Sequence, residues 1–146
     1  MPPSFRILDD IAVADVAFEA IGGTPSELFE AAAQAVIELL ANPKTVSTRW
    51  HRTIELEDDQ LADLFFDWLS EMVYLKDAEQ VVFCRATASV VHDPSRRCWR
   101  VHGELTGESI DAARQELRSD VKAVTKHLYD VHEHEGQWIA RVVLDI

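Results

Sequence analysis

The spacing of hydrophobic residues changes several times along this chain, and each change marks the border of a strand or a helix. Residues 5–8 and 14–21 alternate between apolar and polar positions, as β-strands do. A Gly-Gly pair at 22–23 ends the alternation, and residues 24–27 then read Thr-Pro-Ser-Glu, a capping box with proline in the first helical position. We therefore expect a helix that stops at the Asn-Pro pair 42–43. Its core-facing stripe consists of Leu28, Ala31, Ala32, Ala35, Val36, Leu39 and Leu40.

A second strand and a second helix follow. Residues 46–57 are strand-like, with a clear alternation at 53–56 (Thr-Ile-Glu-Leu). Asp58 is expected to cap the next helix, and the acidic residues at 57–59 suit the positive end of the helix dipole. The stripe of this helix is strongly amphipathic, and we interpret it as part of the core. It consists of Leu61, Leu64, Phe65, Trp68, Leu69, Met72 and Val73.

Four β-rich segments in two pairs complete the chain. The turn sequence Asp-Pro-Ser-Arg-Arg at 93–97 joins the first pair, and Glu-Gly at 135–136 joins the second. Residues 107–119 between the pairs are polar and irregular. The four segments are 81–91, 98–105, 121–132 and 138–144. This order predicts an α+β fold: a single domain over residues 1–146, with a mixed or antiparallel β-sheet covered by two main helices.

Charge narrows the possible partners. The net charge is −12 and the sequence pI is about 4.8, so the protein would repel a polyanion and is not expected to bind nucleic acid by itself. An acidic surface suits a cation or a basic protein partner, and it is also common among soluble proteins with neither. No apolar run is long enough to span a membrane, and no signal peptide is evident. We expect a cytoplasmic protein whose cysteines, Cys84 and Cys98, are free thiols.

Acidic residues at both ends of the chain are the first candidate site. The strand-like run 138–144 delivers the side chain of Asp145 and the α-carboxylate of Ile146 to one point, where their oxygens suit calcium or magnesium. The alternative is that Asp145 accepts backbone N–H bonds while Ile146 only fills the core. Asp15 lies in an otherwise apolar run, so it needs either a backbone cap at a strand bend or a metal ion.

Basic residues near the last hairpin are the second candidate. On a regular strand, Lys122 and Lys126 would share one face and His127 the other. Lys122 can serve as a structural counter-charge or as a phosphate contact, and His127 as a packing residue or a functional one. The His-Glu-His at 132–134 could hold a transition metal or lie at a solvated hairpin end. No phosphate-binding glycine loop, hydrolase motif or paired nucleophile and base occurs in the sequence.

Several segments taken together resemble the archease family over essentially the whole chain. Each match is short, but they occur in the family's order, and the last one places Asp-Ile at the end of the sequence. The matching segments are Ala14-Asp15-Val16, Ala20-Ile-Gly22, Ser26-Glu-Leu-Phe-Glu-Ala-Ala-Ala33, Trp68-Leu-Ser-Glu71 with Tyr74-Leu75, Val121-Lys-Ala-Val-Thr-Lys-His127 and Val142-Val-Leu-Asp-Ile146.

The resemblance implies an accessory protein rather than an enzyme. Its partner would be the RNA ligase that joins 3′-phosphate or 2′,3′-cyclic phosphate ends to 5′-hydroxyl ends in tRNA splicing or RNA repair. The accessory protein would promote guanylylation and multiple turnover of that ligase, and it would meet GTP or RNA only through it. It would carry a divalent cation, Ca²⁺ or alternatively Mg²⁺. The family's metal ligands correspond to Asp15, Asp145 and Ile146, and its residues for partner activation to Lys122 and His127.

Two departures from the family pattern stand out. Where the family has His-Thr-Ala-Asp, this chain has Ala-Val-Ala-Asp at 12–15, and Lys126 stands in place of a tyrosine. The ligating aspartate is kept, but the contribution of the family's histidine is lost. Two other functions remain as alternatives to the activator: a metal-dependent phosphoester hydrolase, and a chaperone-like adaptor without a metal role.

Overall fold

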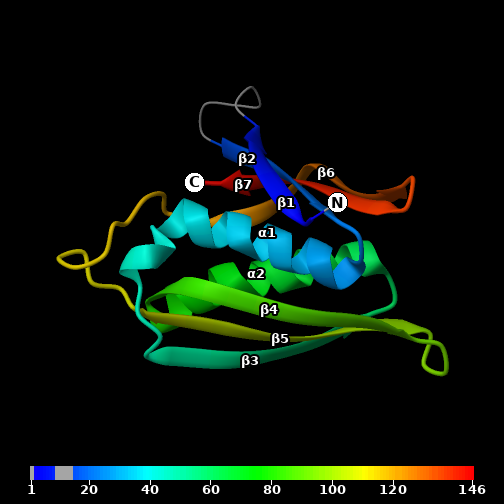
Figure 1. The fold of residues 1–146 in the computed structure, drawn as a ribbon, viewed down its shortest axis with the longest axis horizontal. Helices are drawn as coiled ribbons and strands as arrows, with labels where there is room; N and C mark the ends of the chain where they lie inside the picture. The colour runs from blue at the N-terminus through cyan, green and yellow to red at the C-terminus, as the bar shows by residue number, and fades with distance from the viewer. Residues whose placement is uncertain (1, 9–14) are drawn as a thin grey trace.

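A computed structural model describes residues 2–8 and 15–146, which form two antiparallel β-sheets with two α-helices between them (Figure 1). The four-stranded sheet has the order β1-β2-β7-β6, and the three-stranded sheet has the order β3-β5-β4. The elements are β1 (Ser4–Leu8), β2 (Asp15–Gly22), α1 (Pro25–Leu40), the short 3₁₀ helix η1 (Pro43–Thr45), β3 (Trp50–Asp58), α2 (Leu61–Glu79), β4 (Val81–Asp93), β5 (Cys98–Ser109), β6 (Ala123–His134) and β7 (Gln137–Asp145). The predicted fold class is confirmed, in its antiparallel form, and its strands divide into two sheets.

Helix α1 begins as its sequence predicts. The Thr24 hydroxyl oxygen accepts a hydrogen bond from the Glu27 N–H at 3.1 Å, and the Glu27 carboxylate accepts one from the Gly23 N–H at 2.8 Å. This is a capping-box pattern in which the glutamate reaches the N–H of Gly23, one residue before the N-cap Thr24. The preceding strand runs very close to the helix, because a Cβ atom on Gly22 would lie only 2.5 Å from the Leu28 nitrogen. A larger residue at position 22 would therefore push β2 away from α1.

Helix α2 begins differently from the prediction. Asp58 is the last residue of β3, and the helix starts at Leu61 with Gln60 as its N-cap, so the assignment of Asp58 as the cap was wrong. The Asp58 carboxylate instead accepts a hydrogen bond from the Gln60 N–H at 3.2 Å, within the link between the two elements. An aspartate that caps a helix and an aspartate that stabilises a turn look the same in the sequence. Only the path of the backbone distinguishes the two roles.

Trp68 of α2 stands at the centre of the core. It is fully buried, and its indole N–H donates to the Phe29 carbonyl of α1 at 3.1 Å. The facing strand makes room with Gly103 of β5, where an added Cβ would lie 2.6 Å from the Trp68 ring. The core is therefore shared by both helices and both sheets.

The edge of the smaller sheet is protected by α1, which runs beside β4 (Figure 1). The Ser26 hydroxyl accepts a hydrogen bond from the Val90 N–H at 2.8 Å, and the Glu30 carboxylate accepts one from the Ala88 N–H at 3.0 Å. Free N–H groups on an edge strand can pair with other chains. Here, two side chains of α1 satisfy two of them.

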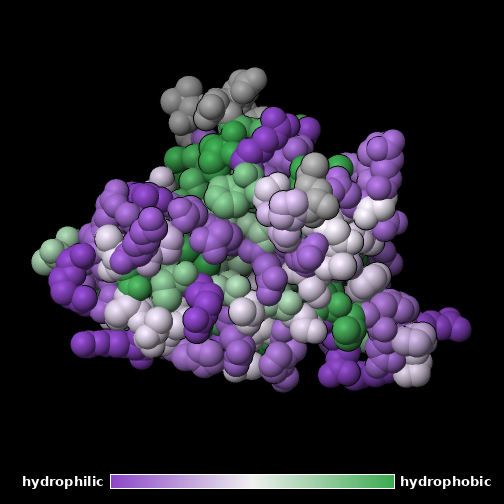
Figure 2. Space-filling model, viewed as in Figure 1, coloured by the Kyte–Doolittle hydropathy of each residue, from purple (hydrophilic) through white to green (hydrophobic). Residues whose placement is uncertain are grey.

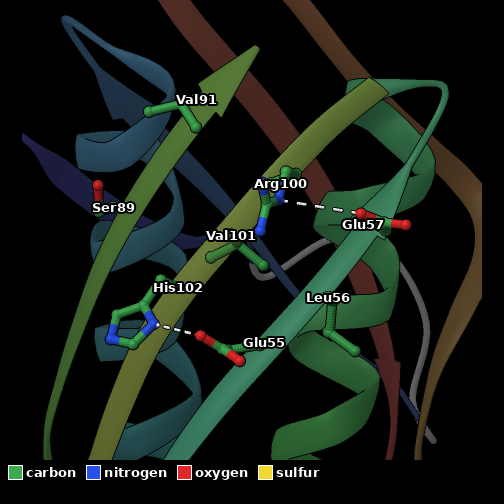
Figure 3. A pocket seen from close by; sticks show the side chains of 8 residues that line it. All are labelled: Glu55, Leu56, Glu57, Ser89, Val91, Arg100, Val101 and His102. Carbon is green, nitrogen blue, oxygen red and sulfur yellow. Dashed lines mark hydrogen bonds and ion pairs between the residues drawn. The ribbon is translucent and has the colours of Figure 1, made fainter. Parts of the chain in front are cut away.

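The outer face of the three-stranded sheet is polar (Figure 3). The His102 ring nitrogen Nδ1 of β5 lies 2.9 Å from the Glu55 carboxylate of β3. The Glu57 carboxylate lies 3.1 Å from the Arg96 guanidinium and 3.9 Å from the Arg100 guanidinium. All these side chains are well exposed, so the pairs contribute little to stability. The face seen in Figure 2 is also largely hydrophilic, with apolar surface gathered near the end of β1. Phe5 of β1 and Ala31 of α1 also line a groove.

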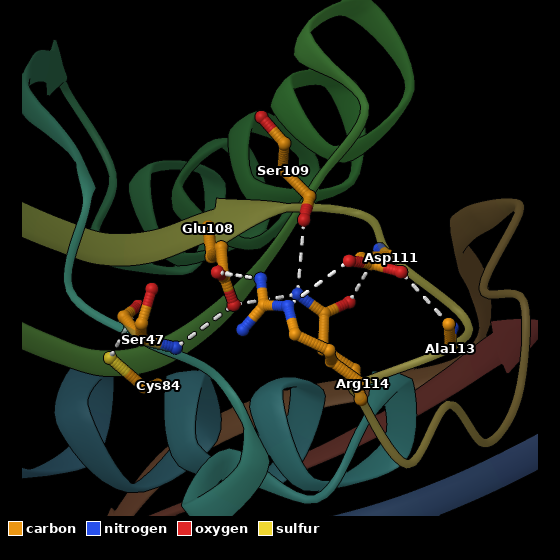
Figure 4. Close-up of polar contacts among 8 residues, drawn as sticks. Ser47, Cys84, Glu108, Ser109, Asp111, Ala113 and Arg114 are labelled. Carbon is orange, nitrogen blue, oxygen red and sulfur yellow. Dashed lines mark hydrogen bonds and ion pairs between the residues drawn. The ribbon is translucent and has the colours of Figure 1, made fainter.

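The irregular segment after β5 is held by Glu108 (Figure 4). This carboxylate is 3% exposed and accepts hydrogen bonds from the Gln115 side chain at 2.8 Å, the Ser47 N–H at 3.1 Å and the Arg114 guanidinium. These donors, Arg114 first, lower the pKa of Glu108 to about 2. The segment after β5, which was predicted to be irregular, is thus held in place by the charged Glu108 side chain.

The two cysteines, Cys84 and Cys98, are free thiols, as expected. No helix in the described part of the chain has the length and apolar character needed to cross a membrane.

Candidate metal and partner site

Asp15 and Asp145 lie opposite each other on neighbouring strands. Asp15 is the first residue of β2, Asp145 is the last residue of β7, and the antiparallel register pairs them directly. Opposite residues in such a pair point to the same face, with Cα atoms about 4.5–5.5 Å apart. The neighbouring residue Leu144 points into the core, so both carboxylates lie on the sheet face turned away from the helices. Both residues are half-buried.

Ile146 directly follows this pair. Its side chain is half-buried and packs against the hydrophobic core, which agrees with the interpretation that it fills the core. The same packing holds its main chain beside Asp145.

Strand β6 pairs with β7 on the side opposite β2. Its first residue, Ala123, is the register partner of Asp145 on the side opposite Asp15. The main-chain N–H of Lys122 donates to the Asp145 carbonyl at 2.7 Å, while the Lys122 side chain is exposed. The main chain of Lys122 therefore lies beside Asp145, whereas its side chain lines a pocket with Tyr74 and Asp77 of α2, on the helix side of the sheet.

Lys76 of α2 fixes the segment that leads to Lys122. Its side chain is only 4% exposed, and the ammonium donates to the Asp120 carboxylate at 2.5 Å and to the Val121 carbonyl at 2.7 Å. Asp77 provides a further carboxylate at 2.8 Å. Burial alone lowers the pKa of Lys76, but the hydrogen bonds and charges of Asp120 and Asp77 outweigh it, so the pKa lies above its ordinary value. The charged lysine thus ties α2 to the strand of the candidate site.

His127 lies apart from the carboxylate pair. It is exposed and belongs to an irregular part of β6, where the register with β7 shifts between Thr125 and Asp130. The strand alternation that we expected from Lys122 to His127 holds only as far as Thr125. The structure therefore brings together Asp15, Asp145, Ile146 and the main chain of Lys122. It places the Lys122 side chain toward α2 and separates His127 from the carboxylate pair by three residues of β6 beyond Ala123.

The donor set agrees in its chemistry with a hard cation. Within residues 2–8 and 15–146, no group of three or more His, Cys, Asp or Glu side chains is arranged to hold a metal ion. Asp15 and Asp145 supply two side-chain carboxylates, and the third ligand would come from the main chain of Ile146. All three provide oxygen, which calcium and magnesium prefer. The family's His-Thr position, here Ala12-Val13, and the acidic pair 9–10 lie outside the described residues.

Three residues of this region were not singled out by the sequence. Lys76 and Asp120 are far apart along the chain and join only when α2 packs beside the segment before β6. Tyr129 donates a hydrogen bond from its hydroxyl to the Ala62 carbonyl of α2 at 2.5 Å. The buried position of Lys76 is signalled only by its place on the apolar side of the α2 stripe.

The fold and this site together define a class: small α+β proteins with two antiparallel sheets around two helices and a pair of carboxylates beside the last strand. The model of the Archease protein family (MTH1598/TM1083) matches residues 5–146. The chain belongs to the archease family.

Its relatives cover nearly the whole chain. It is 32% identical to protein archease of Methanopyrus kandleri over 133 residues, which cover 91% of this chain and 94% of the relative. Protein archease of Methanothermobacter thermautotrophicus is also 32% identical over 133 residues, covering 91% and 93%.

Two solved structures have the same fold. The solution structure of Methanobacterium thermoautotrophicum protein 1598 is similar with a TM-score of 0.80 and 30% identity, covering 97% of this chain and 98% of that one. The crystal structure of an archease from Thermotoga maritima, described as a possible chaperone, has a TM-score of 0.62 and covers the same shares at 19% identity. At that identity the second likeness concerns the fold alone.

Proposed function

We propose that this protein is a metal-binding accessory factor for an RNA ligase. The ligase would join 3′-phosphate or 2′,3′-cyclic phosphate ends to 5′-hydroxyl ends in tRNA splicing or RNA repair, in the cytoplasm. The accessory factor would promote its guanylylation and multiple turnover. The observation that carries this proposal is the direct pairing of Asp15 with Asp145, beside Ile146 and Lys122. The partner is the one that the resemblance to the archease family implies.

Asp15, Asp145 and the main-chain carboxylate of Ile146 would hold the cation, which we take to be Ca²⁺, with Mg²⁺ as the alternative. Bound there, the cation would neutralise carboxylates that otherwise repel one another across neighbouring strands. The residues themselves do the positioning. The β2–β7 ladder fixes the spacing of the two aspartates, and the packed Ile146 side chain holds the end of β7 in place.

Lys122 would contact the partner from the segment next to the cation site. Its backbone is fixed through the hydrogen bond to Asp145 and through the Lys76–Asp120 tie, while its side chain remains exposed. An exposed ammonium on a fixed backbone, here on the side of the sheet that faces α2, is suited to a phosphate or to an acidic group of the partner. His127 is exposed at another point of β6 and would contact the partner separately.

Multiple-turnover RNA joining by the ligase from the same organism tests this function. We expect wild-type protein to stimulate turnover and Asp15→Asn and Asp145→Asn to lose the stimulation. The matched control is Asp59→Asn, which makes the same change of charge at an exposed residue between β3 and α2. Equal loss in the control would assign the effect to net charge.

Two other outcomes would replace the proposal. Stimulation that persists after the metal is removed with a chelator would favour an adaptor without a metal role, in keeping with the description of the Thermotoga maritima protein as a possible chaperone. Hydrolysis of a nucleotide or phosphoester by the isolated protein, lost in Asp15→Asn, would favour the hydrolase.

A further inference from the structure

Strand β6 contains a large bulge. Thr125 pairs with Val143, and the next pair along the strand is Asp130 with Arg141. Four residues of β6, 126–129, therefore lie opposite the single residue Val142 of β7. We call residues 126–129 the β6 bulge. Bulges of this kind re-aim side chains and are frequent next to functional sites.

Both ends of the β6 bulge are tied to α2. At one end, the Tyr129 hydroxyl donates to the Ala62 carbonyl at 2.5 Å, and its ring packs against Phe66 with ring centroids 5.5 Å apart. At the other end, the Lys126 ammonium lies 3.9 Å from the centroid of the Phe66 ring and 3.8 Å from the Asp63 carboxylate. The bulge is thus held at its two ends, while its middle residues, His127 and Leu128, are exposed.

Leu128 has a strained backbone conformation within the β6 bulge. Its φ is 55°, in the left-handed region that a bulky side chain rarely adopts. Among the described residues, three other non-glycine residues have positive φ, and each has a local reason: Gln80 ends α2, and Arg97 and Glu135 lie in hairpin turns. Leu128 is held in this conformation by the β6 bulge, and 48% of its surface is exposed. Its strain is therefore not offset by burial in the fold.

The charges around the β6 bulge are mostly acidic. Asp63 and Asp67 lie on the α2 segment that the bulge contacts, and Asp130 follows it on β6. Burial first, and then the nearby carboxylates of Asp58 and Asp63, raise the pKa of Asp67. The Lys126 ammonium is engaged by Asp63 and Phe66. Leu128 is therefore an exposed apolar side chain surrounded by a mostly acidic surface.

We propose that Leu128 at the apex of the β6 bulge is the residue by which this protein docks on its partner, inserting into an apolar pocket with a basic rim. This inference rests on the proposed function for the identity of the partner, the RNA ligase. The strained, exposed leucine supplies the apolar contact, and the acidic surroundings select a basic rim by charge complementarity. The contact at Leu128 would then supply affinity for the ligase, and the cation site on the outer sheet face would promote its guanylylation and turnover.

The substitution Leu128→Asn separates docking from folding. Asparagine tolerates positive φ, so the bulge is expected to keep its shape and the melting temperature to stay the same or rise. Binding to the purified ligase from the same organism, measured by calorimetry, should weaken by about tenfold or more. The matched control is Leu117→Asn, because Leu117 is also exposed, at 39%, in the segment before β6 near the other end of α2. Its binding should equal that of the wild type.

The outcomes distinguish this inference from the function on which it rests. If wild-type protein stimulates the ligase and Leu128→Asn binds as tightly as wild type, the docking inference is wrong and the function stands. If wild-type protein neither binds nor stimulates the ligase, the proposed function fails, and the docking inference fails with it. A wild-type dimer that Leu128→Asn converts into a monomer, seen by sedimentation equilibrium, would assign the apex to a second copy and overturn the docking inference.

Discussion

Lys76 and Asp120 form a hydrogen-bonded ion pair of 2.5 Å between α2 and the segment that leads into β6. The lysine is buried, whereas the side chain of Asp120 is 74% exposed. The same ammonium also binds the Val121 carbonyl, so it satisfies a main-chain acceptor as well as a charge. Lys122 follows Val121, and its main-chain N–H donates to the Asp145 carbonyl. The Lys76–Asp120 pair therefore connects the helical layer with the candidate site.

Replacing Lys76 by methionine should loosen this connection. We expect the free energy of unfolding to fall by about 1–2 kcal/mol, because the aspartates left behind remain solvated while the Val121 carbonyl loses its donor. The amide of Lys122 should also exchange faster with solvent relative to the core amides. Urea unfolding and hydrogen exchange measure the two effects. The control is Lys44→Met at an exposed lysine of η1, which should change neither quantity.

The Glu108 anchor should make stability depend on acid pH. Its pKa is lowered from an ordinary 4.5 to about 2, so its contribution is complete above pH 4.5 and is lost as the pH falls toward about 2. In Glu108→Gln this contribution is absent at every pH. The difference in unfolding free energy between wild type and variant should therefore be largest near neutral pH and shrink below pH 4.5. A difference that stays constant from pH 7 to pH 2.5 would show that Glu108 carries no charge-dependent stability.

The local elements of this fold follow from its sequence to a large extent. The capping box at Thr24 and Glu27 forms as predicted, and the Glu135–Gly136 turn has the positive φ values that a tight hairpin requires. These signals are local, because each depends on residues within one turn of the chain. The division into two sheets is different. Alternation shows which residues share a face, but it does not show which strands pair.

The candidate site was predicted only as a set of residues. Asp15 and Asp145 are separated by nearly the whole chain, and only the β2–β7 register brings them together. The β6 bulge could not be predicted, because Lys-His-Leu-Tyr contains no glycine, proline or asparagine to mark an irregular strand. It is imposed by tertiary contacts of Tyr129 and Lys126 with α2, which are invisible in a local pattern.

The Tyr129 hydroxyl should contribute measurably to stability. Tyr129→Phe removes the hydrogen bond to the Ala62 carbonyl but keeps the ring against Phe66, so we expect a loss of about 0.5–1.5 kcal/mol in chemical unfolding. Tyr74→Phe is the matched control, because Tyr74 is 63% exposed and its change should lie within about 0.5 kcal/mol. Burial raises the pKa of Tyr129, so its phenol should also stay protonated at an alkaline pH above the ordinary tyrosine pKa. Equal losses in the two variants would contradict a specific role for the bond.

Extending the chain beyond Ile146 tests the most specific feature of the proposed metal site. A short polar tag at this end converts the α-carboxylate of Ile146 into a neutral amide and leaves the side chains of Asp15 and Asp145 in place. If that carboxylate is the third ligand, calcium affinity measured by calorimetry should fall by about tenfold or more, which corresponds to about 1.4 kcal/mol or more of binding free energy. The same tag at the N-terminus is the control and should leave the affinity unchanged. Asp145→Asn should lower it in either background. An affinity that survives the C-terminal tag but is lost in Asp145→Asn would restrict the site to the two side-chain carboxylates that the β2–β7 register brings together.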